Sequence, residues 1–582
     1  MANFYLDNDD IQFLFQHLDV KRLAAIQEEG FDKFPGQFDY APADADEAMD
    51  NYRRILENLG EVAGEQIAPT AADTDVVGNV LNPDGSVTYT PGIAGAIKLL
   101  GQADLMGFTL PYRFGGINCP NLVYTMSNEI VSRADASLMN IYGLQGIAET
   151  INAFASEEIK QAYLPHMSSG EWTGAMVLTE PDAGSDLQAV KTRAYQDEKG
   201  NWFVNGVKRF ITNGCGEVLL VLARTEPEIS DGRGLSVILV ERGPKVKVRR
   251  LENKLGIHGS PTCEIFFDDA PGLLVGDRQR GLITYVMSLM NGARIGIAAQ
   301  SLGIGEAAYR QAREYAHSRK QFEQPIENFP AVRELLVESS VDVQAARALT
   351  YYAAFCVDLE LGALRRLELG DPTTLGVDEK KKLRTESRKY KGYNKLLTPM
   401  AKYYASEMSM RVSNQAMAVL GGSGYMKDYP VERHLRDSRI TTIYEGTSQL
   451  QVIAAVAGVL SGTCKEVLED LLSRTWPAEV EGQIAKIRQG LALLEEGIAF
   501  VKAQGSQYRD LVARKLVDIG IYLVVGTLFC DAATASPKKL AVAKKWLSDK
   551  LPAIHMLHEQ ILAGESITIN EFETLAGPVP VN

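Results

Sequence analysis

Residues 201–212 read NWFVNGVKRFIT, and they lie in a stretch where apolar residues alternate with polar ones or gather in short runs. The segments EVLLVLART, LSVILVER, KVKVRR and CEIFFDD follow, separated by Gly, Pro and Asp turns. Short apolar runs bounded by turn residues are typical of β-strands. We therefore predict a small β domain over residues 171–282.

The sequence on both sides of this β domain has the three- and four-residue spacing of amphipathic helices. AMDNYRRILENLGEVAGEQI is an example before it, and ITYVMSLMNGARIGIAAQSLGIGEAAYRQAREYAHSR is one after it. In the second stretch DPTTLGVDEKKKLR predicts an exposed connection. The predicted units are an N-terminal extension (1–40), a helical domain (41–170), the β domain (171–282), a helical bundle (283–463) and an additional C-terminal helical domain (464–582).

Composition excludes several classes of protein. With 582 residues, 46% hydrophobic and 23% charged, the chain is long enough for several cores and too apolar for wholesale disorder. A net charge of −14 disfavours nucleic acid and anionic membranes as partners. The six cysteines form no C-x-x-C pair and the histidines are scattered, so we expect free thiols, a reducing compartment and no metal site.

The N-terminus and the apolar runs both indicate a cytoplasmic protein. MANFYLDNDDIQFLFQHL has acids where a signal peptide needs lysines. The best apolar run, IYLVVGTLFC, is about half of the roughly 20 residues that span a bilayer, so no membrane span is expected.

Three segments carry candidate chemistry, although each has an ordinary structural explanation when taken alone. LTEPDAGSD (178–186) offers hydroxyls and open N–H groups to a polar cofactor, or is a surface turn. KRFITNG (208–214) places an aromatic ring and a hydroxyl on one strand face, or is only packed strand. In DSRITTIYEGTSQLQ (437–451), Glu445 is a candidate general base or a solvated loop acid. A fourth pattern, Gly303-Ile304-Gly305 with Ala308, fits a nucleotide fingerprint, but it lies within a helical stretch, so close helix packing explains it better.

Taken together and in this order, with YAHSRKQFEQPI and LGGSGY between them, these segments closely resemble the acyl-CoA dehydrogenase family. The resemblance runs from about residue 50 to residue 460. It implies a mainly α fold with a central β domain: an N-terminal helical domain, a middle β domain and a C-terminal four-helix bundle. Long bacterial members with an added C-terminal helical domain would account for the remainder.

The resemblance also implies an activity. Family members hold FAD noncovalently and oxidise an acyl-CoA to its trans-2-enoyl-CoA. A glutamate removes the α-proton while the β-hydrogen leaves as hydride to the flavin, and electrons pass to an electron-transfer flavoprotein. Glu445 matches that glutamate, and Ala293 stands before Arg294, where a second branch of the family carries its base. An acyl-CoA oxidase that uses O₂ and a noncatalytic flavoprotein on the same scaffold stay open as alternatives.

Further residues carry over by position. The resemblance implies a symmetric homo-oligomer, a dimer or tetramer, because one segment reaches the FAD of a neighbouring subunit. Phe210 stands where tryptophan is usual, and Glu323 stands where glycine is usual. The implied cofactor contacts are Met176, Leu178, Thr179, Ser185, Phe210, Thr212, Arg319, Gln321, Phe322, Gly422, Thr447 and Gln449. The implied substrate contacts are Ser185, Asn291, Arg294, Tyr444 and Gly446.

Overall fold

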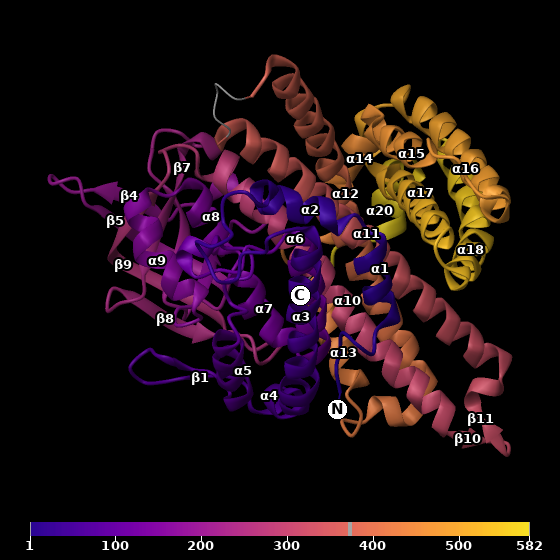
Figure 1. Cartoon of the computed structure of the whole chain (residues 1–582), viewed down its shortest axis with the longest axis horizontal. Coiled ribbons are helices and arrows are strands. Elements are labelled where there is room, and N and C mark those ends of the chain that lie inside the picture. Colours follow the sequence, from indigo (N-terminus) through magenta and orange to yellow (C-terminus); the bar gives the residue numbers. More distant parts are fainter. Residues whose placement is uncertain (1, 370–374, 581–582) are drawn as a thin grey trace.

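The structure is a computed structural model that describes residues 2–369 and 375–580, apart from the side chains of Ser288, Asn291 and Leu369. Helices form the centre and one side of the molecule, and the β domain lies on the opposite side (Figure 1). The N-terminal helices are α1 (Asp9–His17), α2 (Val20–Gln27), α3 (Ala45–Val62), α4 (Ala71–Val77), α5 (Pro91–Gln102), α6 (Asn121–Ala134), α7 (Ala136–Leu144), α8 (Ile147–Phe154) and α9 (Glu157–Ser168). A small hairpin of β1 (Val80–Leu81) and β2 (Val87–Thr88) joins α4 to α5.

The local sequence accounts for several of these helix starts. The Asp44 side chain accepts hydrogen bonds from the backbone N–H groups of Asp46 and Glu47 and so caps α3. Thr90 caps α5 through the N–H of Ile93, and Pro91 occupies the first helical position, where its missing N–H has no cost.

The β domain is a seven-stranded sheet in the order β3-β6-β4-β5-β9-β7, with β8 paired to β9. Strand β6 also pairs with β7, so the sheet curls back on itself. The strands are β3 (Gly174–Val177), β4 (Arg193–Gln196), β5 (Trp202–Thr212), β6 (Val218–Arg224), β7 (Leu235–Glu241), β8 (Val246–Leu251) and β9 (Thr262–Val275).

Strand β6 shows why this domain contains continuous apolar runs. Alternate side chains of a strand point to opposite faces, and both faces of β6 are buried. Leu220 and Leu222 belong to the same apolar cluster as Ile151 of α8, whereas Leu219 and Val221 belong to a separate apolar cluster that includes Val204 of β5.

The bundle consists of α10 (Met287–Ser318), α11 (Pro330–Leu369), α12 (Val377–Leu420), α13 (Val431–Thr441) and α14 (Ser448–Ser461). The glycines of the apparent nucleotide fingerprint are packing residues, as we expected. A Cβ on Gly303 would lie 2.5 Å from the Glu129 carbonyl oxygen of α6, and one on Gly305 would lie 2.8 Å from the Met408 sulfur of α12. The short strands β10 (Lys320–Gln321) and β11 (Gln324–Pro325) form a hairpin between α10 and α11.

The prediction of an exposed connection over DPTTLGVDEKKKLR is wrong for most of its length. Helix α12 begins at Val377, so VDEKKKLR is helical, and the first four residues of the segment, 371–374, lie outside the described residues. Charge density suggested a loop, but Glu, Lys, Leu and Arg are good helix formers.

The added C-terminal domain contains α15 (Thr463–Leu472), α16 (Ala478–Lys502), α17 (Ser506–Ala533), α18 (Pro537–Leu562), α19 (Ile567–Asn570) and α20 (Phe572–Ala576). Helix α17 is long and apolar enough to cross a membrane, but 78% of its apolar window is buried inside the protein, as in a core helix. All six cysteines are free and buried, as expected.

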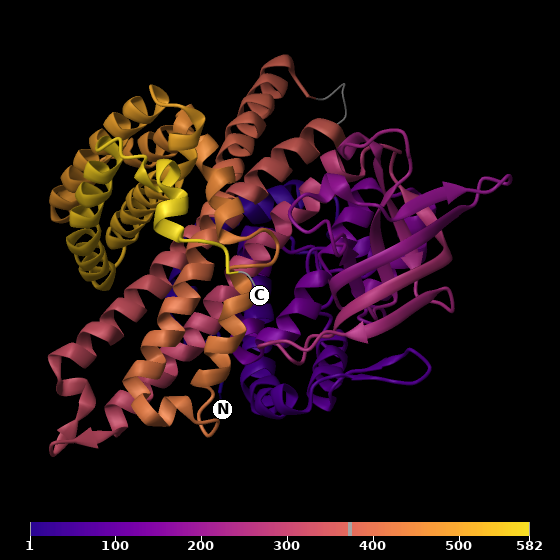
Figure 2. The same ribbon diagram turned by 180° about the vertical axis from the view of Figure 1, so that it is seen from behind.

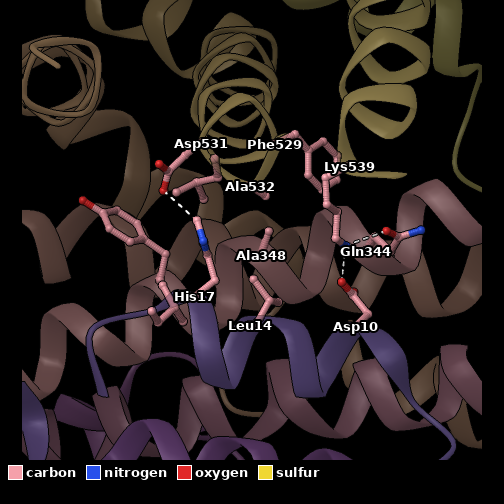
Figure 3. Close-up of a pocket in the computed structure, with 12 residues that line it drawn as sticks. Asp10, Leu14, His17, Gln344, Ala348, Phe529, Asp531, Ala532 and Lys539 are labelled. Atoms are coloured by element: carbon pink, nitrogen blue, oxygen red, sulfur yellow. Dashed lines mark hydrogen bonds and ion pairs between the residues drawn. The ribbon is translucent and has the colours of Figure 1, made fainter. Parts of the chain in front are cut away.

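A narrow seam joins this domain to α1 and α11 (Figure 3). His17 Nε2 lies 3.1 Å from Asp531 Oδ2, Lys539 bonds Asp10, and Lys539 Nζ donates to Gln344 Oε1 at 2.8 Å. The cavity enclosed there measures about 20 Å³, so it holds little more than one water molecule.

Candidate active site

Glu445 lies in the short loop between α13 and α14, in a backbone conformation that is rare for a residue with a side chain. Its φ is +52°, and the next residue, Gly446, has φ +86°. Gln451 Nε2 donates to the carbonyl oxygens of both residues at 3.0 Å, and Lys402 Nζ donates to the Gly446 carbonyl at 2.7 Å. A Cβ on residue 446 would lie 2.5 Å from Gln451 Nε2, so this position requires glycine.

The residue before Glu445 anchors the same loop on the other side. The Tyr444 hydroxyl donates to Asn140 Oδ1 of α7 at 3.0 Å and to Gln300 Oε1 of α10. Gln300 Nε2 in turn donates to Asn140 Oδ1 at 2.9 Å. The loop is therefore held by α7, α10, α12 and α14, and its strained conformation is fixed by partners on every side.

Burial and two nearby cations act in opposite directions on the pKa of Glu445. Burial raises the pKa of its carboxyl, while the charges of Lys402 and Arg294 act in the opposite direction. Burial lowers the pKa of Lys402 to about 7, and burial also lowers the pKa of Arg294. A carboxyl whose pKa is raised accepts a proton more readily than an ordinary carboxyl in water.

The loop 178–186 and strand β5 are brought together by a buried ion pair. Lys208 Nζ of β5 lies 3.0 Å from Glu180 Oε1, and their side chains are 0% and 7% exposed. Lys208 Nζ also donates to the Leu178 carbonyl at 2.8 Å, and the Arg209 N–H donates to the Thr179 carbonyl at 3.0 Å. Two of the three candidate segments thus form one surface.

An exposed aromatic ring stands on this surface. Phe210 is 53% exposed and has φ +60°, at an irregularity in the β5–β9 register. Thr212, two residues on, pairs with Thr262 and is half-buried. Leu178 is buried, Met176 and Thr179 are half-buried, and Ser185 is exposed. A flat apolar ring beside hydroxyl and backbone donors fits a planar, polar-edged cofactor such as a flavin.

Comparison with known proteins decides the family. Residues 49–171, 175–270, and 280–363 with 384–460 match the N-terminal, middle and C-terminal domains of acyl-CoA dehydrogenase, respectively. The chain is also 36% identical over 375 residues to an acyl-CoA dehydrogenase of Bacillus subtilis, which covers 63% of this chain and 90% of the relative. The chain belongs to the acyl-CoA dehydrogenase family. Its members are FAD-dependent oxidoreductases, and the predicted fold class is confirmed.

Two solved structures extend this result. The butyryl-CoA dehydrogenase of Megasphaera elsdenii is 29% identical, with a TM-score of 0.59 over 71% of this chain and 97% of that one. An acyl-CoA dehydrogenase of Bacillus anthracis complexed with FAD has a TM-score of 0.75 over 92% of both chains, at 22% identity. The second likeness shows a shared fold that includes helices beyond the matched family domains.

The structure does not bring all of the predicted cofactor contacts together in one place. Arg319, Gln321 and Phe322 lie on or beside the β10–β11 hairpin, which projects at the far end of the molecule from the β domain in both views (Figures 1 and 2). Phe322 is 85% exposed. Within one chain the hairpin therefore does not reach Phe210.

The remaining predicted contacts lie near the Glu445 loop or on the turn after α12. Thr447 caps α14 through the N–H of Leu450, and Gln449 is exposed on the first turn of that helix. Gly422 is exposed in the short 3₁₀ helix that follows α12. Asn291 is a residue of α10, and its side chain lies outside the described residues.

Four residues that support the site were missed from the sequence: Glu180, Lys208, Lys402 and Gln451. Glu180, Lys208 and Gln451 stand within the segments already singled out, so their place in those segments was the available signal. Lys402 lies outside those segments, and only the tertiary contact reveals it.

Proposed function

We propose that this protein is an FAD-dependent acyl-CoA dehydrogenase in which Glu445 removes the α-proton of an acyl-CoA thioester. One observation carries the proposal: a half-buried carboxyl on a backbone fixed by Gln451 and Lys402, whose pKa is influenced by the charges of Lys402 and Arg294. When bound, FAD accepts the β-hydrogen as hydride. The product is then the trans-2-enoyl-CoA.

The contacts of this chain suggest how its residues share the work. The Glu445 and Gly446 carbonyls are turned towards Gln451 and Lys402. Among the described residues, the Glu445 N–H donates to no backbone carbonyl, which leaves it for the thioester oxygen. Arg294, Tyr444, Gly446 and Ser185 would line the thioester and pantetheine path. Phe210 and Thr212, with Met176, Leu178, Thr179 and Ser185, would face the flavin.

The exposed hairpin supports a homo-oligomer, a dimer or tetramer. The β10–β11 hairpin lies at the far end of the molecule from the β domain in both views, and a second copy would bring its Arg319, Gln321 and Phe322 to a neighbouring FAD. With Gly422, Thr447 and Gln449 they would complete a FAD site across that interface. Light scattering should give a dimer or tetramer, and a FAD-loaded monomer would refute this arrangement.

The test of the chemistry is Glu445→Gln. The variant should bind FAD normally yet show no flavin bleaching when acyl-CoA thioesters are added without oxygen, because the amide accepts no proton. Glu432→Gln is the matched control, since Glu432 lies on α13, which leads into the loop, and is bound to Arg436 instead. Bleaching of the Glu445 variant at the wild-type rate would exclude Glu445 as the base.

The electron acceptor is tested separately. We expect an electron-transfer flavoprotein to reoxidise the reduced enzyme in the cytoplasm. Rapid peroxide formation in air without an added acceptor would instead identify an acyl-CoA oxidase.

A further inference from the structure

We propose that Lys402 is a positioning residue for Glu445, which holds the Glu445–Gly446 backbone in place and keeps the base unprotonated through its own positive charge. The inference rests on the proposed function, since it concerns the base of that reaction. It assigns Lys402 a role in the proton affinity of the site as well as in its shape.

The position of Lys402 is the first observation. Its side chain is 0% exposed on α12, and its Nζ donates to the Gly446 carbonyl at 2.7 Å. Lysine is almost never fully buried without a partner, because removing an ammonium group from water is costly. The charged groups that face it are Glu445 of the loop, Arg294 of α10 and Glu407 on its own helix.

The second observation is that the hydrogen bond alone does not require a lysine. Gln451 Nε2 already donates to the Glu445 and Gly446 carbonyls, each at 3.0 Å. The loop backbone therefore has a neutral donor on the same carbonyl that Lys402 contacts. A second neutral donor would fix the backbone at a lower desolvation cost than a buried ammonium group. What Lys402 adds is its charge.

The charges of the pair act on each other. Burial raises the pKa of Glu445, and Lys402 is the larger of the two cationic influences that oppose this rise. Burial lowers the pKa of Lys402 to about 7, and Glu445 opposes that change in turn. Each group therefore favours the charged form of the other.

Removal of the Lys402 charge should change the pKa of Glu445 in a definite direction. Without the ammonium group the carboxylate form of Glu445 is less stable, so its pKa rises further. Flavin reduction needs the carboxylate, and the acidic limb of its pH profile should move to higher pH. An opposite charge within about 4–6 Å of a carboxyl lowers its pKa by about one unit or more, so a shift of that size is expected when such a charge is lost.

Three variants separate the charge from the hydrogen bond. Lys402→Gln keeps a donor without charge, Lys402→Met removes both, and Lys402→Arg keeps both. Lys539→Met is the control for loss of a buried lysine, since Lys539 of the added domain is 7% exposed and bonds Asp10 of α1 and Gln344 of α11. Each protein is loaded with FAD and checked by melting temperature, and anaerobic flavin bleaching by acyl-CoA is then followed from pH 5 to pH 9.

The expected result is an acidic limb shifted upwards by about one pH unit in the Gln and Met variants, and unshifted in Lys402→Arg and Lys539→Met. A wild-type limb in Lys402→Gln would overturn the proposal, because the charge would then have no effect. Failure of both neutral variants to fold or hold FAD, with a functional Arg variant, would also overturn it and leave Lys402 a role in folding. Failure of the wild type itself to bleach would count against the proposed function instead.

Discussion

Substitution of Lys208 by Met should destabilise the β domain and loosen the loop that faces Phe210. Lys208 is fully buried, 3.0 Å from Glu180 Oε1, and it donates to the Leu178 carbonyl at 2.8 Å. Its removal leaves the Glu180 carboxylate with the N–H groups of Lys191 and Thr192 but without a cation. Breaking a buried ion pair from one side costs about 3–5 kcal/mol.

The pKa values show why the pair should be tested as a unit. Burial lowers the pKa of Lys208 to about 8 from 10.5, although Glu180 opposes the change. This lowering of the Lys208 pKa corresponds to about 3 kcal/mol. It is the part of the cost of burying the Lys208 charge that Glu180 does not offset. Glu180→Gln with Lys208→Met removes both charges, so the double variant should be no less stable than either single one. A coupling of about 3 kcal/mol follows.

The assay is urea unfolding of the wild type, both single variants and the double variant, with FAD affinity measured from flavin fluorescence. Lys191→Met is the matched control, because Lys191 pairs with Asp182 across 3.7 Å while both side chains are largely exposed, and such a pair contributes less than about 1 kcal/mol. Strictly additive effects, with a coupling below about 0.5 kcal/mol, would refute the reasoning.

The Lys208–Glu180 pair should also make the stability of the folded protein depend on pH in a definite direction. The unfolded chain keeps the Lys208 proton up to about pH 10.5, whereas the folded protein releases it near pH 8. The unfolded state therefore binds more protons between these values, and stability relative to Lys208→Met should rise with pH in this window.

Two further predictions concern the buried Arg347 cluster and the Glu445 loop. Arg347→Met should lower the free energy of unfolding by about 3–5 kcal/mol, because it leaves Glu129, Glu306 and Asp10 without the buried guanidinium. Urea unfolding checks this against Arg366→Met, an exposed pair, and equal effects would contradict it. Gly446→Ala should slow anaerobic flavin bleaching at least tenfold with FAD still bound, since its Cβ would lie 2.5 Å from Gln451 Nε2. Gly482→Ala, with no neighbour within 4 Å, is the control, and an unchanged rate for Gly446→Ala would show that the loop tolerates the shift.

Much of the fold could be predicted from the sequence because local periodicity and burial agree there. The β6 run, buried on both faces, reads as strand, and the helices of the added domain read as amphipathic. The prediction for the residues at the start of α12 was wrong for the opposite reason. Its charged first turns have no apolar periodicity, and helix propensity rather than burial determines their structure.

The site was predictable only in part, because a motif identifies the residues that face a ligand and not those that hold them. Glu445, Phe210 and Thr212 were identified through a family resemblance, and their roles stay predictions. The left-handed backbone at Glu445 depends on Gln451 and Lys402, and the second of these lies on a helix with no motif of its own. Spacing along the chain does not show which helix face meets a loop.

The N-terminal segment shows a second contact that no pattern revealed. From the sequence it was only an extension, but Asp10 of α1 bonds both Arg347 of the bundle and Lys539 of the added domain. Arg347 also holds Glu129 of α6 and Glu306 of α10. One line of buried charges therefore runs from the matched family domains to the added helices. Since an unpaired buried charge is costly, the loss of either cation should loosen α1 and the added domain together.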